Sequence, residues 1–415
     1  MRNRIIAGLL AVALLYSALT TRCYQGFADS ITGILDAYFP KEEKIATDAK
    51  EAPELSVSEK VSASMRTIST NLLADLPYKN SMVELSGKTM KLSGMRSYYN
   101  NTYGLNITTD GYNVGRYLAT STDYEVQQMI GFKKYLDDKG IDLLYVSEPA
   151  KYIDDAYYTE QFGGESFLNR NTDLFLSRIG EAGIDYVDLR DNIRQEGIDS
   201  KSLFFRTDHH WTVPAAKWAA QITAQKLNDT FGYKIDMSLY DDSAFNVVEY
   251  KDCWLGEQGR KVAKSYIGLE DYTMMEPKYE TSYKVLNSAG EVVNKGDFGI
   301  FINKDIYTAD VDPYESPSWH YSYNDYAFSH IHNNNVKKGK VLVLGDSYES
   351  SMAPFLSLGL KDVEVIVPRS IPEGVSVRDY VESGEYDTVI IAYAQFMIGA
   401  HDVEGNANYK MFTLE

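Results

Sequence analysis

The stretch that decides the fold is "KGKVLVLGDSYESS", residues 338–351. Its apolar run, Val341–Leu344, is typical of a buried strand, and a helix is expected to begin near Met352–Pro354. A buried strand that runs into a turn and then a helix is the repeating unit of a parallel α/β sheet. Ligands bind such sheets beyond the carboxyl ends of the strands, so Ser347 is placed where a nucleophile should lie.

The same helix–glycine–strand pattern recurs in the first half of the chain. Apolar residues at helical spacing predict a helix over Tyr124–Asp138, which Gly140 ends before the strand "IDLLYV" at 141–146. A second repeat has a helix over Phe167–Glu181, a stop at Gly183 and a strand from Ile184, and further strands begin at Val363 and Thr388. These elements predict an α/β fold with a parallel sheet that helices cover on both faces.

Residues 234–316 differ in residue composition from the helix–glycine–strand repeats. The segment "YKVLNSAGEVVNKGDFGIFIN", residues 283–303, combines β-branched and aromatic residues with glycine-containing turns, as β-hairpins do. We interpret 234–316 as a β-rich insertion in the α/β domain that covers the site.

The N-terminus predicts export. Arg2 and Arg4 precede the uncharged run "IIAGLLAVALLYSALT", residues 5–20. We interpret residues 1–28 as a signal anchor, with cleavage after Ala28 as the alternative, and 29–60 as a charged linker to a domain at 61–415. Because the basic residues come first, the domain should be extracytoplasmic and attached to the membrane.

Charge and composition exclude one class of partner. The formal net charge is −18 and the chain contains no basic block, so we expect no nucleic-acid binding. The 33 tyrosines are either ordinary packing residues or flat amphipathic rings that stack on sugar faces.

The segment "FFRTDHHWTVPAA", residues 204–216, supplies the base that a serine nucleophile needs. In an extended segment Asp208 and His210 would point to the same side and His209 away from it. The carboxylate would then fix the tautomer of the imidazole. The alternatives are a metal site that His330 and His332 complete, which consecutive ligands make awkward, and solvated loop histidines.

Taken together, Asp-x-His-Trp upstream and Gly-Asp-Ser downstream resemble the SGNH-hydrolase-like proteins of the alginate O-acetyltransferase group, and the full "DHHW" resembles the DHHW family. The resemblance covers about 67–397 and includes "LLYVSEPAK", residues 143–151. It implies that Ser347 is the nucleophile, His210 the base and Asp208 its orienting acid. In ordinary SGNH hydrolases the Asp-x-x-His pair follows the serine, whereas here the acid–base motif precedes it.

The groups that would hold an oxyanion or the substrate are less defined. The usual glycine and asparagine blocks of SGNH hydrolases are not evident. The candidates for the oxyanion are the Ser347 N–H, Arg369 in "VIVPRS" and Gln395 in "IAYAQF", and Lys151 is a candidate for facing substrate. An ordinary structural role is the alternative for each side chain.

The resemblance implies a serine O-acyltransferase that acetylates hydroxyl groups of a cell-surface or secreted polysaccharide through an acyl-enzyme. It also implies a membrane-bound O-acyltransferase as the partner that supplies acetyl groups, and it requires no cofactor and no metal ion. An acetylesterase with the same triad, or a catalytically silent glycan-binding or assembly protein, are the alternatives.

Overall fold

The computed structural model describes residues 79–99, 104–303, 312–314, 327–402 and 406–415. The chain divides into two units, Met1–Ser93 and Gly94–Glu415, and in the first of these the described element is α3 (Lys79–Ser93). The predicted anchor and linker, residues 1–60, lie outside the described residues. Among the residues that are described, no helix has the length and apolar character needed to cross a membrane.

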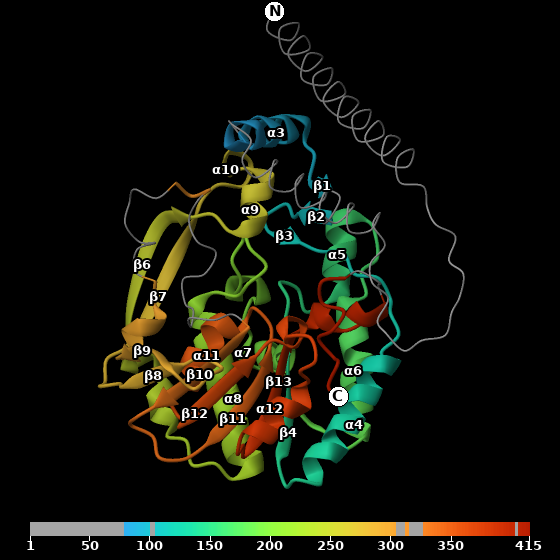
Figure 1. The fold of residues 1–415 in the computed structure, drawn as a ribbon. Coiled ribbons are helices and arrows are strands. Elements are labelled where there is room, and N and C mark those ends of the chain that lie inside the picture. The colour runs from blue at the N-terminus through green and yellow to red at the C-terminus, as the bar shows by residue number, and fades with distance from the viewer. Residues whose placement is uncertain (1–78, 100–103, 304–311, 315–326, 403–405) are drawn as a thin grey trace, which may run out of the picture. The chain divides into compact units, whose positions relative to one another are not determined.

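The second unit is built around one large sheet (Figure 1). Its eight strands lie in the order β5-β4-β13-β11-β12-β10-β8-β9. The first five are mutually parallel: β5 (Asp185–Asp188), β4 (Asp142–Glu148), β13 (Thr388–Ala394), β11 (Lys340–Gly345) and β12 (Asp362–Ile366). The last three are added antiparallel: β10 (Phe328–Asn333), β8 (Tyr283–Leu286) and β9 (Val292–Gly296).

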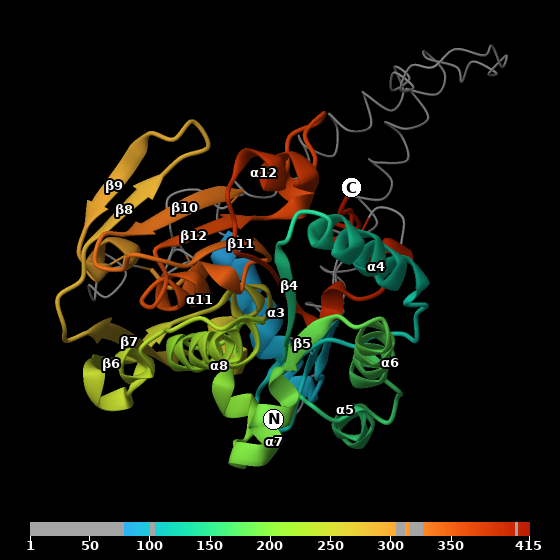
Figure 2. The same ribbon diagram turned by 90° about the horizontal axis from the view of Figure 1, so that it is seen from below.

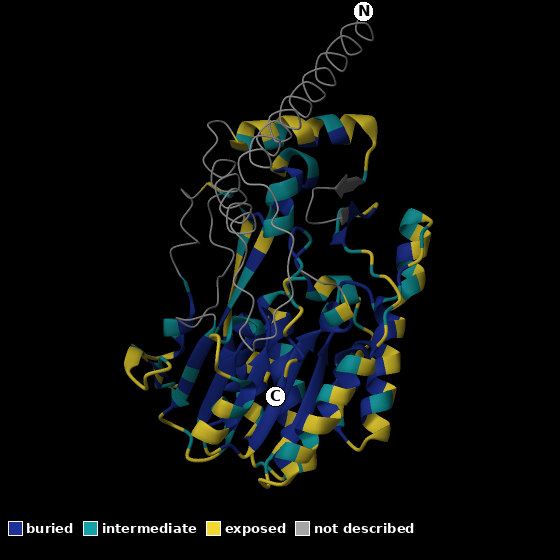
Figure 3. Cartoon of the chain, turned by 45° about the vertical axis from the view of Figure 1, so that its right-hand side comes forward, coloured by how far each residue is buried: buried dark blue, intermediate teal, exposed yellow. Residues whose placement is uncertain are grey.

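Helices cover both faces of this sheet, as Figure 2 shows. Alternate strand residues point to opposite faces, so Val341 and Val343 enter one hydrophobic cluster and Leu342 and Leu344 the other. The first cluster includes α8 (Val213–Phe231) and α11 (Glu349–Leu356). The second includes α4 (Asp123–Asp137), α6 (Leu168–Glu181) and α12 (Val377–Ser383). Figure 3 shows the strands buried between partly exposed helices. The predicted α/β fold with a mostly parallel sheet is confirmed.

The remaining described elements lie mostly in the connections. They are β1 (Ser97–Tyr99), β2 (Gly104–Ile107), β3 (Asn113–Val114), α5 (Asp155–Phe162), α7 (Leu189–Glu196), β6 (Phe245–Trp254), α9 (Glu257–Val262), α10 (Lys264–Ile267) and β7 (Glu270–Pro277). Strands β1–β3 form a small antiparallel sheet, and β6 and β7 form a two-stranded ribbon.

One prediction needs correction. The helix after Ser347 begins at Glu349 rather than near Met352, and Pro354 lies inside it at its sixth residue, where the first turn is already complete. The hairpin predicted within 283–303 is present, and it extends the central sheet by pairing with β10. Another part of 234–316, around Gly256, packs against Asp208.

Candidate active site

Ser347 lies directly beyond the carboxyl end of β11, in a turn that its neighbours hold. The Asp346 carboxylate accepts the Tyr348 N–H at 2.8 Å and, from the adjacent strand β13, the Ala394 N–H at 2.9 Å. Gly345 is required because a β-carbon there would collide with the side chain of Glu349. These contacts fix the strand–turn–helix unit that presents Ser347.

The "DHHW" segment is a tight loop, not an extended strand. Phe204 and Trp211 form an isolated antiparallel bridge, and the Phe205 N–H donates to the His210 carbonyl at 3.1 Å. From the outside, the Glu270 carboxylate accepts the Arg206 N–H at 2.6 Å and the Thr207 N–H at 2.8 Å. The loop is therefore closed by its own backbone and tied to β7.

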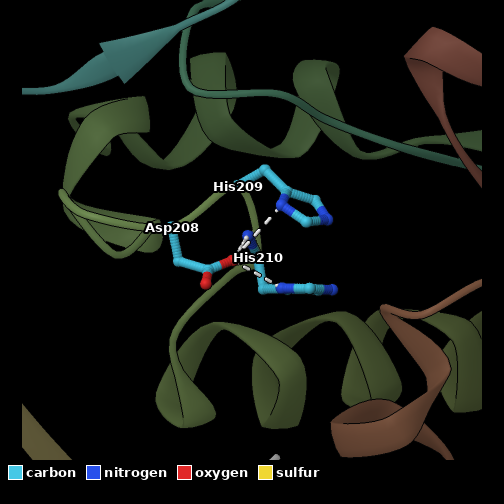
Figure 4. Close-up of side chains that lie close together, drawn as sticks. All are labelled: Asp208, His209 and His210. Atoms are coloured by element: carbon cyan, nitrogen blue, oxygen red, sulfur yellow. Dashed lines mark hydrogen bonds and ion pairs between the residues drawn. The ribbon is translucent and has the colours of Figure 1, made fainter. Parts of the chain in front are cut away.

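Asp208 and His210 meet inside this loop (Figure 4). Oδ1 of Asp208 lies 2.6 Å from Nδ1 of His210 and also accepts the His210 backbone N–H at 3.1 Å. Oδ2 accepts the Glu257 N–H at 2.7 Å. Because the carboxylate can only accept, the ring proton must lie on Nδ1, which leaves Nε2 free to accept a proton.

Ser347 completes the arrangement from the other end of the chain. Its Oγ lies 2.8 Å from Nε2 of His210, within hydrogen-bond reach of a base. Asp208 is fully buried, and 8% of the Ser347 surface is exposed. The structure thus brings the three side chains together, although Ser347 and His210 are 137 residues apart in the sequence.

Comparisons with known proteins show similarity to acetyltransferase domains. Residues 116–246 match the family model described as the SGNH hydrolase-like domain of acetyltransferase AlgX, a range that contains Asp208 and His210 and ends before Ser347. This match covers less than half of the chain. The probable alginate O-acetylase AlgJ of Pseudomonas aeruginosa is 33% identical over 103 residues, which is 24% of this chain and 25% of that protein.

Two solved structures share the fold of this chain. Bacillus cereus PatB1, solved with a sulfonyl adduct, has a TM-score of 0.57 at 15% identity and covers 75% of this chain and 97% of its own. A DHHW family protein from Eubacterium siraeum has a TM-score of 0.54 at 14% identity and covers 77% of this chain and 97% of its own. At these identities the likeness concerns the fold alone.

His209 does not point away from the site, contrary to the alternation argument. Its ring packs beside that of His210, with centroids 3.8 Å apart, and its Nδ1 lies 3.3 Å from Oδ1 of Asp208 (Figure 4). Alternation requires an extended backbone, and the loop reverses direction here. Asp208 still meets His210, because its side chain accepts the backbone N–H two residues on, as aspartates do in turns.

Electrostatics favour a charged Asp208 and a neutral His209. Burial opposes ionisation of Asp208, but His210, His209 and the Glu257 N–H outweigh it and hold the pKa of Asp208 well below its usual range. Burial and the neighbouring His210 lower the pKa of His209. The carboxylate is therefore available to stabilise an imidazolium on His210.

The other predicted site residues have structural partners. Gln395 is buried; its Oε1 accepts the Ala150 N–H at 2.9 Å, and its Nε2 donates to Asn169 and Thr172. Arg369 donates through Nη1 to Oδ1 of Asn408. Both side chains are thus engaged within the domain.

Lys151 is buried, and its Nζ donates to the carbonyls of Asn113 at 2.7 Å and Arg206 at 3.2 Å. Burial lowers the pKa of Lys151 to about 7. It lines a small cavity of about 30 Å³ together with His209 and Tyr348, which are the sequence neighbours of His210 and Ser347. Its amine supports the start of the "DHHW" loop through the Arg206 carbonyl.

Sequence reasoning missed Asn113, Gly256 and Glu270. Asn113 is buried on the same small cavity, and neither polar atom of its side-chain amide has a partner among the described residues. Gly256 gives Glu257 access to Asp208, because a β-carbon there would lie 2.5 Å from Cβ of Asp208. No local motif marks these positions; only the long-range packing reveals them.

Three carboxyl groups lie buried beneath the Ser347 turn: Glu148, Asp346 and Glu349. The side chains of Glu148 and Glu349 hydrogen-bond to each other, which requires a proton on one of the two carboxyl groups. Burial raises the pKa of Glu148 well above its usual value and that of Glu349 to about 8. Near neutral pH these shifts favour the uncharged forms of both glutamates.

Two further features are separate from this chemistry. A cavity of about 980 Å³ runs along α8, past Trp218 and Met275, and none of the three converging side chains lines it. Ligand atoms converge in two groups among the described residues: Asp208, His209 and His210, and His330, His332 and Asp362. In the first group Nδ1 of His210 is already hydrogen-bonded to Oδ1 of Asp208.

Proposed function

We propose that this chain is a membrane-anchored, extracytoplasmic serine O-acetyltransferase that acetylates hydroxyl groups of a polysaccharide through an acyl-enzyme. The observation that carries the proposal is the chain of contacts from Oγ of Ser347 to Nε2 of His210 at 2.8 Å and from Nδ1 of His210 to Oδ1 of Asp208 at 2.6 Å. The match to an acetyltransferase domain over 116–246 supports the choice of acetyl transfer.

In the first half-reaction Nε2 of His210 takes the proton from Ser347 as its Oγ attacks the acetyl carbonyl of the donor. The tetrahedral oxyanion then collapses, the donor oxygen leaves with the proton from His210, and acetyl-Ser347 remains. Asp208 stabilises the imidazolium that forms between the two proton transfers. The Ser347 N–H is our candidate for holding the oxyanion, and Asn113 is the candidate side chain.

In the second half-reaction a sugar hydroxyl gives its proton to Nε2 of His210 and attacks the acetyl-serine carbonyl. Collapse of this intermediate returns the proton to Oγ of Ser347 and releases the acetylated sugar. If water takes the place of the sugar hydroxyl, the same steps give an esterase. In the setting that the resemblance implies, a membrane-bound O-acyltransferase supplies the acetyl group and the N-terminal anchor keeps the domain near it.

The test uses the full-length chain with a chromogenic acetyl ester as donor and a soluble oligosaccharide as acceptor. We expect acetyl-Ser347 in peptide mass spectra and acetylated oligosaccharide in the products, both lost in Ser347→Ala. Ser350→Ala, a buried serine in the same segment, is the matched control and should retain both. A label that persists in Ser347→Ala would point to another nucleophile. Ester turnover that never acetylates the acceptor would favour the esterase.

A further inference from the structure

A second cluster of metal-binding side chains lies on the antiparallel part of the central sheet. Nε2 of His330 and Nδ1 of His332 lie 2.8 and 2.7 Å from the same oxygen, Oδ1 of Asp362. His330 and His332 are two residues apart on β10 and so share one face of the strand. Asp362 is the partner of His332 across the β10–β12 pairing, so all three side chains project from hydrogen-bonded strands.

We propose that His330, His332 and Asp362 form a zinc-binding site that joins β10 to β12. Two imidazole nitrogens and one carboxylate oxygen are ligands that Zn²⁺ accepts, and a three-residue set leaves the fourth tetrahedral position for water. The side chains of His330 and His332 are 21% and 27% exposed, so solvent and the ion can reach them.

The distances fit a site that opens slightly when the ion enters. Zinc–ligand bonds of about 2.0–2.1 Å at tetrahedral angles separate neighbouring ligand atoms by roughly 3.3 Å. The two nitrogen–oxygen distances, 2.8 and 2.7 Å, therefore need to lengthen by about half an ångström, which small side-chain rotations allow. On binding, each ring carries its proton on the nitrogen that faces away from the ion.

A neighbouring carboxylate is placed to orient one of the ligands. Glu364 is the cross-strand partner of His330, and its Oε2 lies 3.8 Å from Nδ1 of His330, the nitrogen opposite the proposed ligand atom. The Tyr386 hydroxyl donates to the other oxygen of Glu364 at 2.7 Å. Histidines that bind zinc usually donate their second N–H to such a carboxylate, so Glu364 fits a positioning role. Lys361 lies 3.8 Å from Oδ2 of Asp362, which leaves Oδ1 to the ion.

This site is distinct from the candidate active site. Asp362 pairs with Lys340, the first residue of β11, whereas Ser347 follows the last residue of that strand. At about 3.3 Å per residue the two sites are roughly 20 Å apart. The ion would therefore brace the antiparallel strands, and acetyl transfer would not depend on it. The proposal departs from the expectation of a metal-free chain, which was drawn from the "DHHW" motif.

The test measures zinc bound to untagged full-length chain by equilibrium dialysis against buffered zinc chloride, followed by elemental analysis. We expect one zinc per wild-type chain, and at least about tenfold weaker binding in His332→Ala, Asp362→Asn and Glu364→Gln. His401→Ala, which changes a histidine outside both clusters, is the matched control. Zinc should also raise the melting temperature of the wild type, and magnesium should not.

Three outcomes would overturn the proposal: no zinc on the wild type at millimolar zinc, binding that His332→Ala leaves unchanged, or binding that His209→Ala abolishes. The last would place the ion at the "DHHW" loop. Should His332→Ala fail to fold, visible absorption of the wild type loaded with Co²⁺ decides the matter. A tetrahedral site gives strong bands, and octahedral Co²⁺ in their place would count against it.

Discussion

Replacing Asp208 by asparagine tests the proposed base most directly, because the side chain keeps its size and loses its charge. Both carboxylate oxygens of Asp208 act only as acceptors. Oδ1 accepts hydrogen bonds from Nδ1 and the backbone N–H of His210, and Oδ2 accepts one from the backbone N–H of Glu257 at 2.7 Å. The –NH₂ group of an asparagine must therefore face a donor, whichever way the amide turns.

Each orientation of the amide has a defined cost. Facing Glu257, it leaves a buried backbone N–H unpaired, which costs about 1–3 kcal/mol of stability. If the –NH₂ group faces His210, the backbone N–H of His210 is left unpaired at a similar cost. The –NH₂ group also donates to Nδ1, so the ring proton moves to Nε2 and His210 cannot accept a proton from Ser347. In both orientations the charge that stabilises the imidazolium is gone. The same substitution in a serine-protease triad lowers kcat about 10⁴-fold, and we expect a loss of that order.

The assay compares kcat/KM for a chromogenic acetyl ester and the free energy of unfolding in denaturant. Asp242→Asn is the matched control, since that side chain is 95% exposed in its ion pair with Lys217. The control should keep its activity and lie within about 0.5 kcal/mol of wild type. If Asp208→Asn keeps more than a tenth of wild-type kcat/KM, the role assigned to Asp208 is wrong. Adding Asp208→Asn to Ser347→Ala should cost little further activity, because the two residues act as a unit.

Three further predictions concern residues around the site. His209→Gln should lower stability more than turnover, because the ring packs on His210 and does not contact Ser347; a loss of turnover as large as that of His210→Ala would contradict this. Gly256→Ala should lower both the activity and the melting temperature, because the new β-carbon would lie 2.5 Å from Cβ of Asp208. Gly131→Ala is the control: a β-carbon there meets nothing within 4 Å, so this change should stabilise α4 by about 0.5–1 kcal/mol. Burial raises the pKa of Glu349 to about 8, so the contribution of this carboxyl group to the free energy of unfolding is fully present below its ordinary pKa. That contribution falls by up to about 1.4 kcal/mol per pH unit as the pH rises toward 8. Glu349→Gln should reduce the fall in stability over this range, and an unchanged slope would refute the burial argument.

Much of the parallel sheet could be predicted because its signals are local. β11 and β13 are buried on both faces, so each is a continuous apolar run. Such a run can be recognised as a strand from its own sequence, without knowing which strands lie beside it. The helices before β4 and β5 end at Gly140 and Gly183, which adopt positive φ angles of 70° and 76°. Such features lie within about fifteen residues of sequence, and their boundaries matched the structure closely.

The antiparallel edge could not be predicted in the same way. Whether the hairpin of β8 and β9 stands alone or extends the sheet depends on its pairing with β10, some 45 residues further along the chain. Nothing within 283–303 specifies that partner. The same holds for His330 and Asp362, which the β10–β12 pairing brings together.

At the site, residue types were easier to predict than their surroundings. Ser347, His210 and Asp208 carry chemistry that limits their possible roles, whereas Lys151 and Gln395 are polar residues whose hydrogen-bond partners only the fold defines. His209 was misplaced because the alternation rule was applied to a loop. The loop conformation in turn depends on Glu270, which is 64 residues from Arg206 and has no motif of its own.

The last residue of the "DHHW" motif explains how two distant segments reach hydrogen-bond distance. Trp211 is buried, and its indole N–H faces the Tyr348 carbonyl at 3.2 Å and the Ser351 hydroxyl at 3.0 Å, both just beyond Ser347. In return, the Tyr348 hydroxyl donates to the His209 carbonyl at 2.6 Å. These reciprocal bonds dock the loop onto the nucleophile turn on either side of His210. The four residues of the motif therefore differ in what they do. In the proposed mechanism Asp208 orients the base and His210 accepts the proton, whereas His209 packs against His210 and Trp211 holds the loop beside Ser347.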